Sequence, residues 1–272
     1  MLKSLLNTAV VALGLAAFAL PATPVDARSL DEVLSSGVVR VGVNPSLPPR
    51  ALYDDNNEIV GFEPDIAAAI AEMLGVELEL VRVGSPDRIP FVASGRVDFV
   101  MGAMARTAER AKVIDYTVPL HTASYGIVTP ADSGIKSFED LNSDAVTLVQ
   151  VRGTTAVAWL EANVPNATLL LLDNYEDRDR ALAQGRADAS FDGIDSVSYR
   201  LRIFPEREWN VIPYPAFGIE YSGLGVQKGN STLKDWLNIA LFDLHRTGVV
   251  EAKWQEWFLQ PMPAPVPYSP FF

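Results

Sequence analysis

Short apolar stretches of strand length alternate with helix-length segments from Ser29 onward. Period-two or continuous apolar runs predict strands, whereas apolar residues at three- and four-residue spacing predict helices. The expected strands are 38–43, 76–80, 97–101, 145–151, 168–172, 187–191 and 221–226. The expected helices are 64–74, a segment that includes 91–94, then 155–162, 175–184, 193–203, 233–247 and 251–258. This alternation is typical of an α/β fold.

Local signals predict several boundaries of these elements. Pro64 suits the first turn of a helix, and Gly75 and Gly248 suit the position just after one. Residues 137–140, Ser-Phe-Glu-Asp, fit a capping box at a helix start. Residues 261–272 are rich in proline, so we expect an extended strap or a loose tail there.

One short string occurs twice. Residues 93–98 read Ala-Ser-Gly-Arg-Val-Asp and residues 183–188 read Ala-Gln-Gly-Arg-Ala-Asp. Each string is expected to close a helix and open a strand, and the order of the surrounding elements also repeats. The sequence therefore predicts two lobes of similar topology.

The first 27 residues have the pattern of a secretory signal peptide. Lys3 precedes an apolar stretch at 5–20, and Val-Asp-Ala at 25–27 suits a cleavage site. The apolar stretch is shorter than the ~20 residues that a membrane-spanning helix needs, although a retained anchor is the alternative. Cleavage after Ala27 would remove Lys3 and Asp26, so the net charge would stay at −12. We expect a free periplasmic protein.

Composition excludes several classes of function. The 272 residues contain no cysteine, which excludes disulfides, thiolate metal sites and lipid attachment to cysteine. With 22 basic and 34 acidic residues and no basic patch, binding to nucleic acid or to an anionic membrane surface is not expected. The partner is therefore predicted to be a small molecule.

The order and spacing of several strings resemble the bacterial extracellular solute-binding proteins of family 3, the polar amino-acid receptors of ABC importers. The strings are Val-Gly-Val at 41–43 with Pro-Pro at 48–49, Gly-Phe-Glu-Pro-Asp-Ile-Ala at 61–67, Ile-Pro at 89–90 with Ser-Gly-Arg-Val-Asp at 94–98, Gly-Ala-Met-Ala-Arg-Thr-Ala-Glu-Arg at 102–110, Gly-Thr-Thr at 153–155 and Gly-Arg-Ala-Asp-Ala at 185–189. The resemblance covers about residues 30–260.

The resemblance implies a clamshell, the type II periplasmic-binding-protein fold, with two α/β lobes joined by two hinge strands. Lobe 1 would comprise residues 28–123 and 223–272, and lobe 2 residues 124–222. The hinge strands would be 124–128 and 219–223. The ligand would lie in the cleft between the lobes.

The resemblance also implies a set of ligand contacts. Arg110 lies where the family has its clamp for the ligand carboxylate, and the planar guanidinium suits that role. Backbone N–H groups of Thr154 and Thr155 would meet the same carboxylate at a helix start, where capping is a compatible role. Asp192 matches the partner of the ligand ammonium, with Asp195 as the alternative.

Specificity depends on further positions of the cleft. Residues 85–90, Ser-Pro-Asp-Arg-Ile-Pro, are similar to the branch that binds glutamate and aspartate, where the serine and arginine hold the side-chain carboxylate. Ser85 and Arg88 are therefore expected to favour an acidic ligand. The alternative for Arg88 is an exposed arginine paired with Asp87.

Four positions depart from the family pattern. Asn44 stands where the acidic-ligand branch has another arginine, and Leu47 stands where many members stack an aromatic ring on the ligand. Arg50 replaces an aromatic residue and would supply the missing cation if it points inward, or would lie in a solvated loop if it points outward. Ala105 replaces a serine or threonine, so Ala103 would contribute through its backbone.

No enzymatic site can be assembled from the sequence. The two histidines, His121 and His245, are far apart, and no catalytic residues, cofactor or metal ligands are assigned. The leading prediction is a monomeric receptor for a polar amino acid, an acidic one included, or a related small carboxylate. It would deliver this ligand to an ABC permease in the inner membrane. The alternatives are a ligand-presenting sensor and a periplasmic dehydratase of the cyclohexadienyl dehydratase type.

Overall fold

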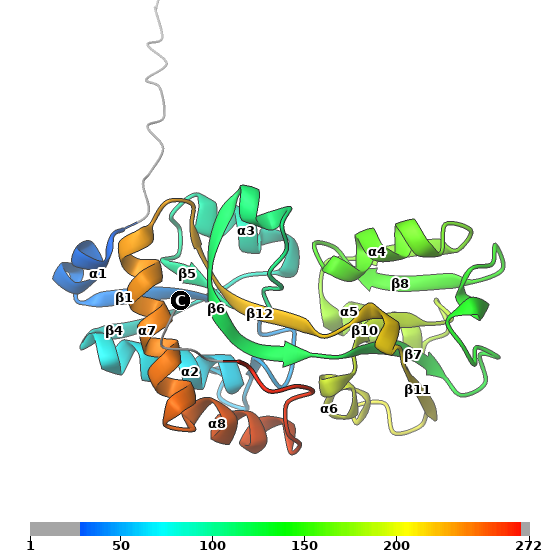
Figure 1. Cartoon of the computed structure of the whole chain (residues 1–272). Coiled ribbons are helices and arrows are strands. Elements are labelled where there is room, and N and C mark those ends of the chain that lie inside the picture. The colour runs from blue at the N-terminus through cyan, green and yellow to red at the C-terminus, as the bar shows by residue number, and fades with distance from the viewer. Residues whose placement is uncertain (1–27, 268–272) are drawn as a thin grey trace, which may run out of the picture.

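The computed structural model describes residues 28–267, which form two α/β lobes side by side (Figure 1). Two segments of chain cross between the lobes. Strand β6 leads through Ser124 into β7, and the chain returns through Gly218 and Ile219 into β12. The segment interpreted as a signal peptide, residues 1–27, lies outside the described residues.

Lobe 1 is built on a five-stranded sheet with the order β4-β1-β5-β12-β6. Strands β4 and β5 run parallel to β1, whereas β12 is antiparallel to both of its neighbours. The strands are β1 (Val38–Val43), β4 (Glu77–Arg82), β5 (Phe99–Val100), β6 (Ile114–Ala123) and β12 (Glu220–Gln227), with a hairpin of β2 (Leu52–Tyr53) and β3 (Ile59–Val60) beside them.

Helices cover both faces of this sheet. They are α1 (Leu30–Ser36), α2 (Phe62–Leu74), α3 (Arg88–Ala93), α7 (Ser231–Arg246) and α8 (Val249–Phe258). On one face Phe62 of α2 packs edge-on against Trp254 of α8, with ring centroids 5.3 Å apart. On the other face Val92 of α3 packs with Val100 of β5. Burial of these apolar faces is the main force that holds the lobe together.

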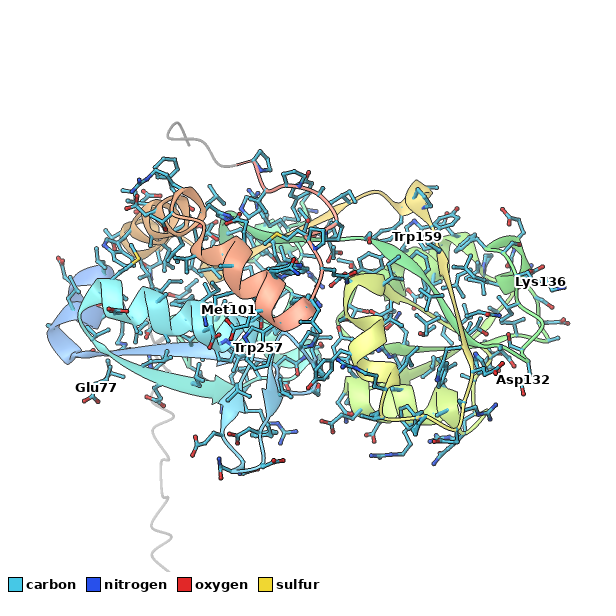
Figure 2. The ribbon with its side chains drawn as sticks, turned by 90° about the horizontal axis from the view of Figure 1, so that it is seen from below. Glu77, Met101, Asp132, Lys136, Trp159 and Trp257 are labelled. Atoms are coloured by element: carbon cyan, nitrogen blue, oxygen red, sulfur yellow. The ribbon has the colours of Figure 1, made fainter. Side chains whose placement is uncertain are left out.

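Lobe 2 has a three-stranded antiparallel sheet, β10-β7-β11, and a parallel pair, β8-β9. A parallel bridge between Leu148 and Ala189 joins the two. The strands are β7 (Tyr125–Pro130), β8 (Thr147–Val151), β9 (Thr168–Leu172), β10 (Ser190–Gly193) and β11 (Trp209–Pro213), and the helices are α4 (Thr155–Asn163), α5 (Tyr175–Ala183) and α6 (Val197–Leu201). Figure 2 shows Trp159 in this lobe, and its ring stacks on that of Phe191 at 4.7 Å.

Short 3-10 helices supply several of the turns. They are η1 (Ser85–Asp87), η2 (Arg110–Lys112), η3 (Glu139–Leu141), η4 (Ile194–Ser196) and η5 (Pro215–Phe217). The capping box predicted at 137–140 is therefore wrong as the start of an α-helix. Only its reverse half forms, because the Asp140 carboxylate accepts from the backbone N–H groups of Lys136 and Ser137.

The repeated string has the same local structure in both lobes, as predicted. Gly95 and Gly185 end their helices in the left-handed region, with φ of 68° and 69°. The carboxylate of Asp98 then accepts from Arg40 N at 2.6 Å, and that of Asp188 accepts from Thr147 N at 2.7 Å. Each aspartate thus joins the strand after the string to the parallel strand beside it, β1 in lobe 1 and β8 in lobe 2.

Most of the other predicted helices and strands are confirmed to within a few residues at their ends. The strand predicted over 187–191 is shifted to 190–193, and the helix predicted over 193–203 is the 3-10 helix η4 followed by the short helix α6. Strand β6 was not predicted, and Pro119 lies in its centre. The structure accommodates this proline because β6 is an edge strand and its pairing with β12 shifts in register at Pro119 and Gly223.

The proline-rich segment after α8 is a strap over the described residues 261–267. Thr122 donates its hydroxyl to the Ala264 carbonyl at 2.7 Å, and Val266 is buried. The rest of the predicted tail, residues 268–272, lies outside the described part. Within residues 28–267 no helix combines the length and the apolar character needed to cross a membrane.

Candidate functional site

Two arginines of lobe 1 meet one turn of lobe 2. Arg88 Nη2 donates to the carbonyl oxygen of Gly153 at 3.1 Å, and Arg110 Nη2 donates to the same oxygen at 2.6 Å. Within residues 28–267 neither guanidinium has a carboxylate within 4.0 Å. Two cations therefore converge between the lobes without an anionic partner from the described chain.

Arg88 is buried at the start of α3. Besides Gly153 it donates to the backbone carbonyls of Ser85 at 3.0 Å and Ala103 at 3.2 Å, and also to that of Gly102. Burial lowers the pKa of Arg88, and the positive charge of Arg110 adds to this effect. The sequence alternative of an exposed Arg88 paired with Asp87 is wrong, since this side chain is only 3% exposed.

The turn at 102–103 is shaped by Glu63, which sequence reasoning did not include in the site. Both oxygens of the buried Glu63 carboxyl accept from this turn, from Gly102 N at 2.7 Å and from Ala103 N at 2.9 Å. Ala103 has φ of +53°, a conformation that is costly for a residue with a Cβ and needs such support. The sequence carried only a weak signal, because Glu63 and Asp65 both lie in the first turn of α2 and only the structure shows that Glu63 is buried.

Asn44 and Ser85 lie next to each other beside this turn, and both are buried. Asn44 Nδ2 donates to Ser85 Oγ at 3.1 Å, and Asn44 Oδ1 accepts from the hydroxyl of Ser46 at 2.8 Å. The structure thus brings these two predicted positions together.

An apolar contact joins the lobes next to the arginines. Leu47 of lobe 1 is 3% exposed and packs with Val151 and Tyr175 of lobe 2, with Ala103 at its edge. Leu47 therefore closes the cleft as an aliphatic side chain where the resemblance led us to expect an aromatic ring in many relatives.

The remaining predicted carboxylate contacts lie around Arg110. Arg110 Nη1 donates to the Ala105 carbonyl at 3.2 Å. Thr154 is the N-cap residue of α4, but its hydroxyl donates to the Val151 carbonyl instead of capping the helix. Thr155 Oγ1 donates to Glu220 at 2.7 Å. The roles of these residues toward a ligand stay predictions.

Asp192 lies at the cleft end of β10 but is held by two arginines of its own lobe. Its carboxylate forms ion pairs with Arg178 and, at 2.7 Å, with Arg200, and these arginine side chains are 0% and 2% exposed. Arg178 also pairs with Asp179 at 2.7 Å. Although burial by itself raises the pKa of Asp192, Arg178 and Arg200 lower it below its ordinary value. Sequence reasoning missed both arginines.

Asp195, the alternative to Asp192, is also paired. Its Oδ2 lies 2.5 Å from Nη2 of Arg50, and both side chains are buried. The guanidinium of Arg50 lies over the Phe258 ring, 5.1 Å from its centroid. Arg50 therefore points inward, as one of the two alternatives from the sequence expected. Its guanidinium, however, pairs with Asp195 of lobe 2.

Glu220 is a further acidic group near the arginines that sequence reasoning missed. It begins β12, and its carboxylate accepts from Thr155 Oγ1 and from the hydroxyl of Tyr125. Burial raises the pKa of Glu220, against the lowering effects of the Thr155 hydroxyl and the Arg110 charge. No local sequence signal marks this residue, since it follows a turn and opens an apolar strand.

The lobes lie close together at this site. A cavity of about 50 Å³ remains beside Arg88, Arg110 and Gly153. That is little more than the ~30 Å³ that one water molecule occupies in the liquid. A hollow of about 500 Å³ lies at the mouth of the cleft, between Asn44 and Asp87 of lobe 1 and Asn174 of lobe 2. An amino acid can therefore reach the arginines only if the lobes move apart.

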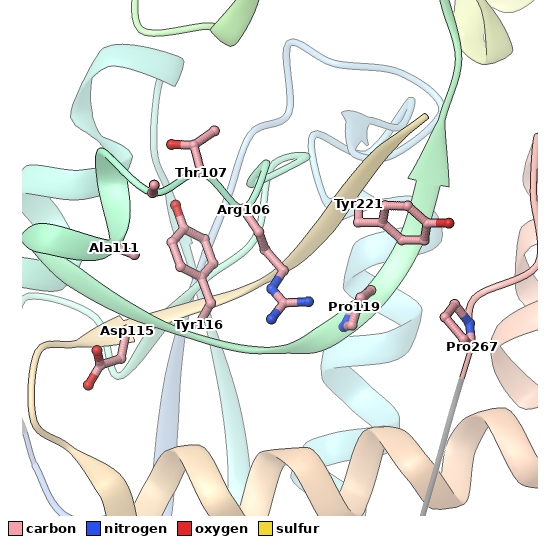
Figure 3. A pocket seen from close by; sticks show the side chains of 9 residues that line it. Arg106, Thr107, Ala111, Asp115, Tyr116, Pro119, Tyr221 and Pro267 are labelled. Atoms are coloured by element: carbon pink, nitrogen blue, oxygen red, sulfur yellow. The ribbon is translucent and has the colours of Figure 1, made fainter. Parts of the chain in front are cut away.

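Another hollow, of about 770 Å³, lies on lobe 1 beside Arg106, Tyr116 and Tyr221 (Figure 3). Pro267 of the strap lies at its rim. Its lining comes from lobe 1, the start of β12 and the strap, so its occupant would not contact lobe 2 and would not favour closure. Within residues 28–267 no cluster of three potential metal ligands is present.

Two α/β lobes that close over a cleft lined by arginines define a two-lobed solute receptor of the type II periplasmic-binding-protein class. Residues 39–260 match the bacterial extracellular solute-binding proteins, family 3, and the chain belongs to this family. The family resemblance and the fold class predicted from the sequence are thereby confirmed.

Individual relatives bind amino acids. The chain is 26% identical to the glutamate/aspartate import solute-binding protein of Escherichia coli, over 94% of this chain and 89% of that protein. It is also 26% identical to the L-cystine-binding protein TcyJ of Escherichia coli, over 86% and 87% of the two chains. Among solved structures, the ancestral amino acid-binding protein AncCDT-1, a precursor of cyclohexadienyl dehydratase, matches with a TM-score of 0.78 and 31% identity, covering 84% of this chain and 99% of that chain.

Proposed function

We propose that this protein is a periplasmic receptor that captures an amino acid or a related small carboxylate between its lobes and delivers it to an ABC importer. The observation that carries the proposal is the convergence of Arg88 and Arg110 on the Gly153 carbonyl oxygen. A carboxylate offers two coplanar acceptor oxygens to a guanidinium group. It also neutralises the positive charge of the arginines, which a neutral carbonyl group cannot do.

The mechanism follows from the placement of Arg110 on lobe 1 and of the turn at 153–155 on lobe 2. A ligand that docks on Arg110 of lobe 1 gains contacts with the turn at 153–155 only when lobe 2 closes. Contacts made only in the closed form shift the equilibrium toward that form. The closed form then presents a joined surface of both lobes to the permease. The assignment to capture is supported by relatives that are themselves binding proteins.

Ligand screening tests the proposal first. The chain from Arg28 to Phe272 would be unfolded, washed and refolded to remove co-purified ligand. It would then be melted with each of the twenty amino acids, with cystine and with small carboxylates such as glutarate and succinate. A ligand at 100 times its Kd stabilises by about 2.7 kcal/mol, which a melting curve resolves. Stabilisation by none of these compounds contradicts the proposal.

Arg110→Ala tests the site itself. Loss of the counter-charge for a buried carboxylate is expected to raise the Kd of the stabilising amino acid by about 100-fold or more. Arg186→Ala is the matched control, because Arg186 is exposed on lobe 2 after α5. Equal affinities of the two variants would remove Arg110 from the site.

The alternatives named from the sequence have separate tests. A sensor would bind the same ligand but would not restore uptake in cells that lack this protein. A dehydratase would form product from its substrate, so turnover would be sought by mass spectrometry with the refolded chain. Neither alternative predicts a different set of contacts for the arginines.

A further inference from the structure

Glu220 connects the hinge to the helix start of lobe 2. Thr155 Oγ1 donates to Glu220 Oε2 at 2.7 Å, and the Tyr125 hydroxyl lies 3.2 Å from Oε1. Backbone pairing of Glu220 with Ala123 fixes the residue at the first position of β12. Three segments, the starts of β7, α4 and β12, therefore meet at one half-buried carboxylate.

The partners of Glu220 are neutral hydroxyl groups. Within residues 28–267 no arginine, lysine or histidine forms an ion pair with it at 4.0 Å or less. Arg110 and Arg88 are nevertheless near enough for their charges to oppose the rise in its pKa that burial causes. Among residues 28–267, the carboxylate of Glu220 is thus an acidic group of the cleft that no basic side chain contacts directly.

By contrast, the two acidic residues expected to bind the ligand ammonium group already form ion pairs with arginines. Asp192 contacts Arg178 and Arg200, and Asp195 contacts Arg50. A ligand ammonium at Asp192 would compete with a guanidinium 2.7 Å away that has no exposed position to move to without losing its own buried partners. Separating a buried ion pair is strongly unfavourable.

Opposite charges flank the turn at 153–155. Arg110 contacts Gly153 at one end of the turn, and Glu220 contacts Thr155 two residues further along. An α-amino acid carries its carboxylate and its ammonium group on the same carbon atom, so it presents adjacent opposite charges to this turn.

We propose that Glu220, rather than Asp192, receives the ammonium group of the ligand while Arg110 holds its α-carboxylate. The inference rests on the proposed function and makes it narrower, because it requires a ligand with an α-ammonium group and not a carboxylate alone. The hydroxyls of Thr155 and Tyr125 position the Glu220 carboxylate for this contact.

Glu220→Gln removes the charge but keeps a side-chain oxygen that accepts from Thr155. Its effect is measured by calorimetric titration with matched pairs: L-glutamate with glutarate, L-aspartate with succinate, and L-cystine with dithiodipropionate. If another amino acid stabilises the protein most, it is paired with its own des-amino acid. We expect the Kd of the amino acid to rise about 30-fold or more and that of the des-amino acid to change less than about threefold.

Two further variants separate charge from structure. Glu220→Asp keeps the charge and is expected to retain part of the preference for the amino acid, which keeps the test decisive if Glu220→Gln folds poorly. Asp192→Asn is expected to lower the melting temperature while leaving the ratio of the two Kd values close to that of the wild type.

The outcomes distinguish the two proposals. If the wild type binds an amino acid but Glu220→Gln weakens both members of its pair equally, or neither, the role of Glu220 is overturned and the receptor function stands. The role is also overturned if Asp192→Asn, and not Glu220→Gln, abolishes the preference. If the wild type binds only small carboxylates without an ammonium group, the role of Glu220 is overturned and the receptor function stands. If it binds neither an amino acid nor such a carboxylate, the proposed function fails and this inference fails with it.

Discussion

Arg50 of lobe 1 and Asp195 of lobe 2 form a buried ion pair between the lobes. Arg50 Nη2 lies 2.5 Å from Asp195 Oδ2, and the two side chains are 3% and 1% exposed. The side chain of Gln260, two residues after the end of α8, donates to the Asp195 carbonyl at 2.7 Å. The guanidinium of Arg50 lies 5.1 Å and 5.6 Å from the centroids of the stacked Phe258 and Trp254 rings. The pair therefore joins lobe 2 to the part of lobe 1 where α8 and the residues after it lie.

Removing one member of this pair is expected to destabilise the protein strongly. Arg50→Met leaves the Asp195 carboxylate buried without its counter-charge, at a cost of about 3–5 kcal/mol in the free energy of unfolding. Chemical denaturation measures this cost. The double variant Arg50→Met with Asp195→Leu is expected to recover much of the loss, because neither charge then remains. Equal stability of the wild type and Arg50→Met would show that the pair contributes nothing.

Arg88→Leu is expected to have two effects. It leaves the carbonyls of Gly102 and Ala103 without their donor, so the free energy of unfolding should fall by about 2 kcal/mol or more. If Arg88 also reads a side-chain carboxylate, the Kd of L-glutamate should rise far more than that of L-glutamine. Titration calorimetry with both amino acids measures the ratio. An unchanged ratio would leave Arg88 with only its role in the turn.

Stability should fall in mild acid because of His121. Burial lowers the pKa of His121 well below its ordinary value, and the charge of Arg50 acts in the same direction. The unfolded chain therefore takes up a proton below pH 6.5 that the folded chain excludes, so stability present above this pH is lost as the pH falls. The nearby Glu63, 4.0 Å away, has a raised pKa, mainly through burial, and opposes the loss at lower pH.

His121→Gln isolates this contribution. The free energy of unfolding of the wild type should decrease between pH 7 and pH 5 by at most about 1.4 kcal/mol per pH unit from this group. The slope of the variant over the same interval should be smaller, whatever its absolute stability. Urea denaturation at several pH values measures both slopes, and identical slopes would show that His121 does not cause the pH dependence.

The local sequence pattern was sufficient to predict most of the secondary structure and the shared local structure of the repeated string. Gly95 and Gly185 end helices, and Asp98 and Asp188 bind the neighbouring strand, because short-range geometry fixes these contacts. Strand β6 was not predicted, and its tolerance of Pro119 depends on its position at a sheet edge. That position is a property of the assembled sheet.

The family and the positions that line the cleft were also evident from the sequence, because strings such as 102–110 and 153–155 keep their order and spacing. The pairing of the charged side chains was not evident from the sequence. Arg178 lies among charged residues of α5 that suggest a solvated surface, yet it is fully buried against Asp192. Which cation meets which anion depends on side chains that approach from distant segments, and the energy of each pair depends on its burial. Only the tertiary structure therefore decided that Asp192 and Asp195 are paired with arginines. It also decided that Glu220 contacts the turn at 153–155, which the cleft arginines also contact, without an ion pair of its own among residues 28–267.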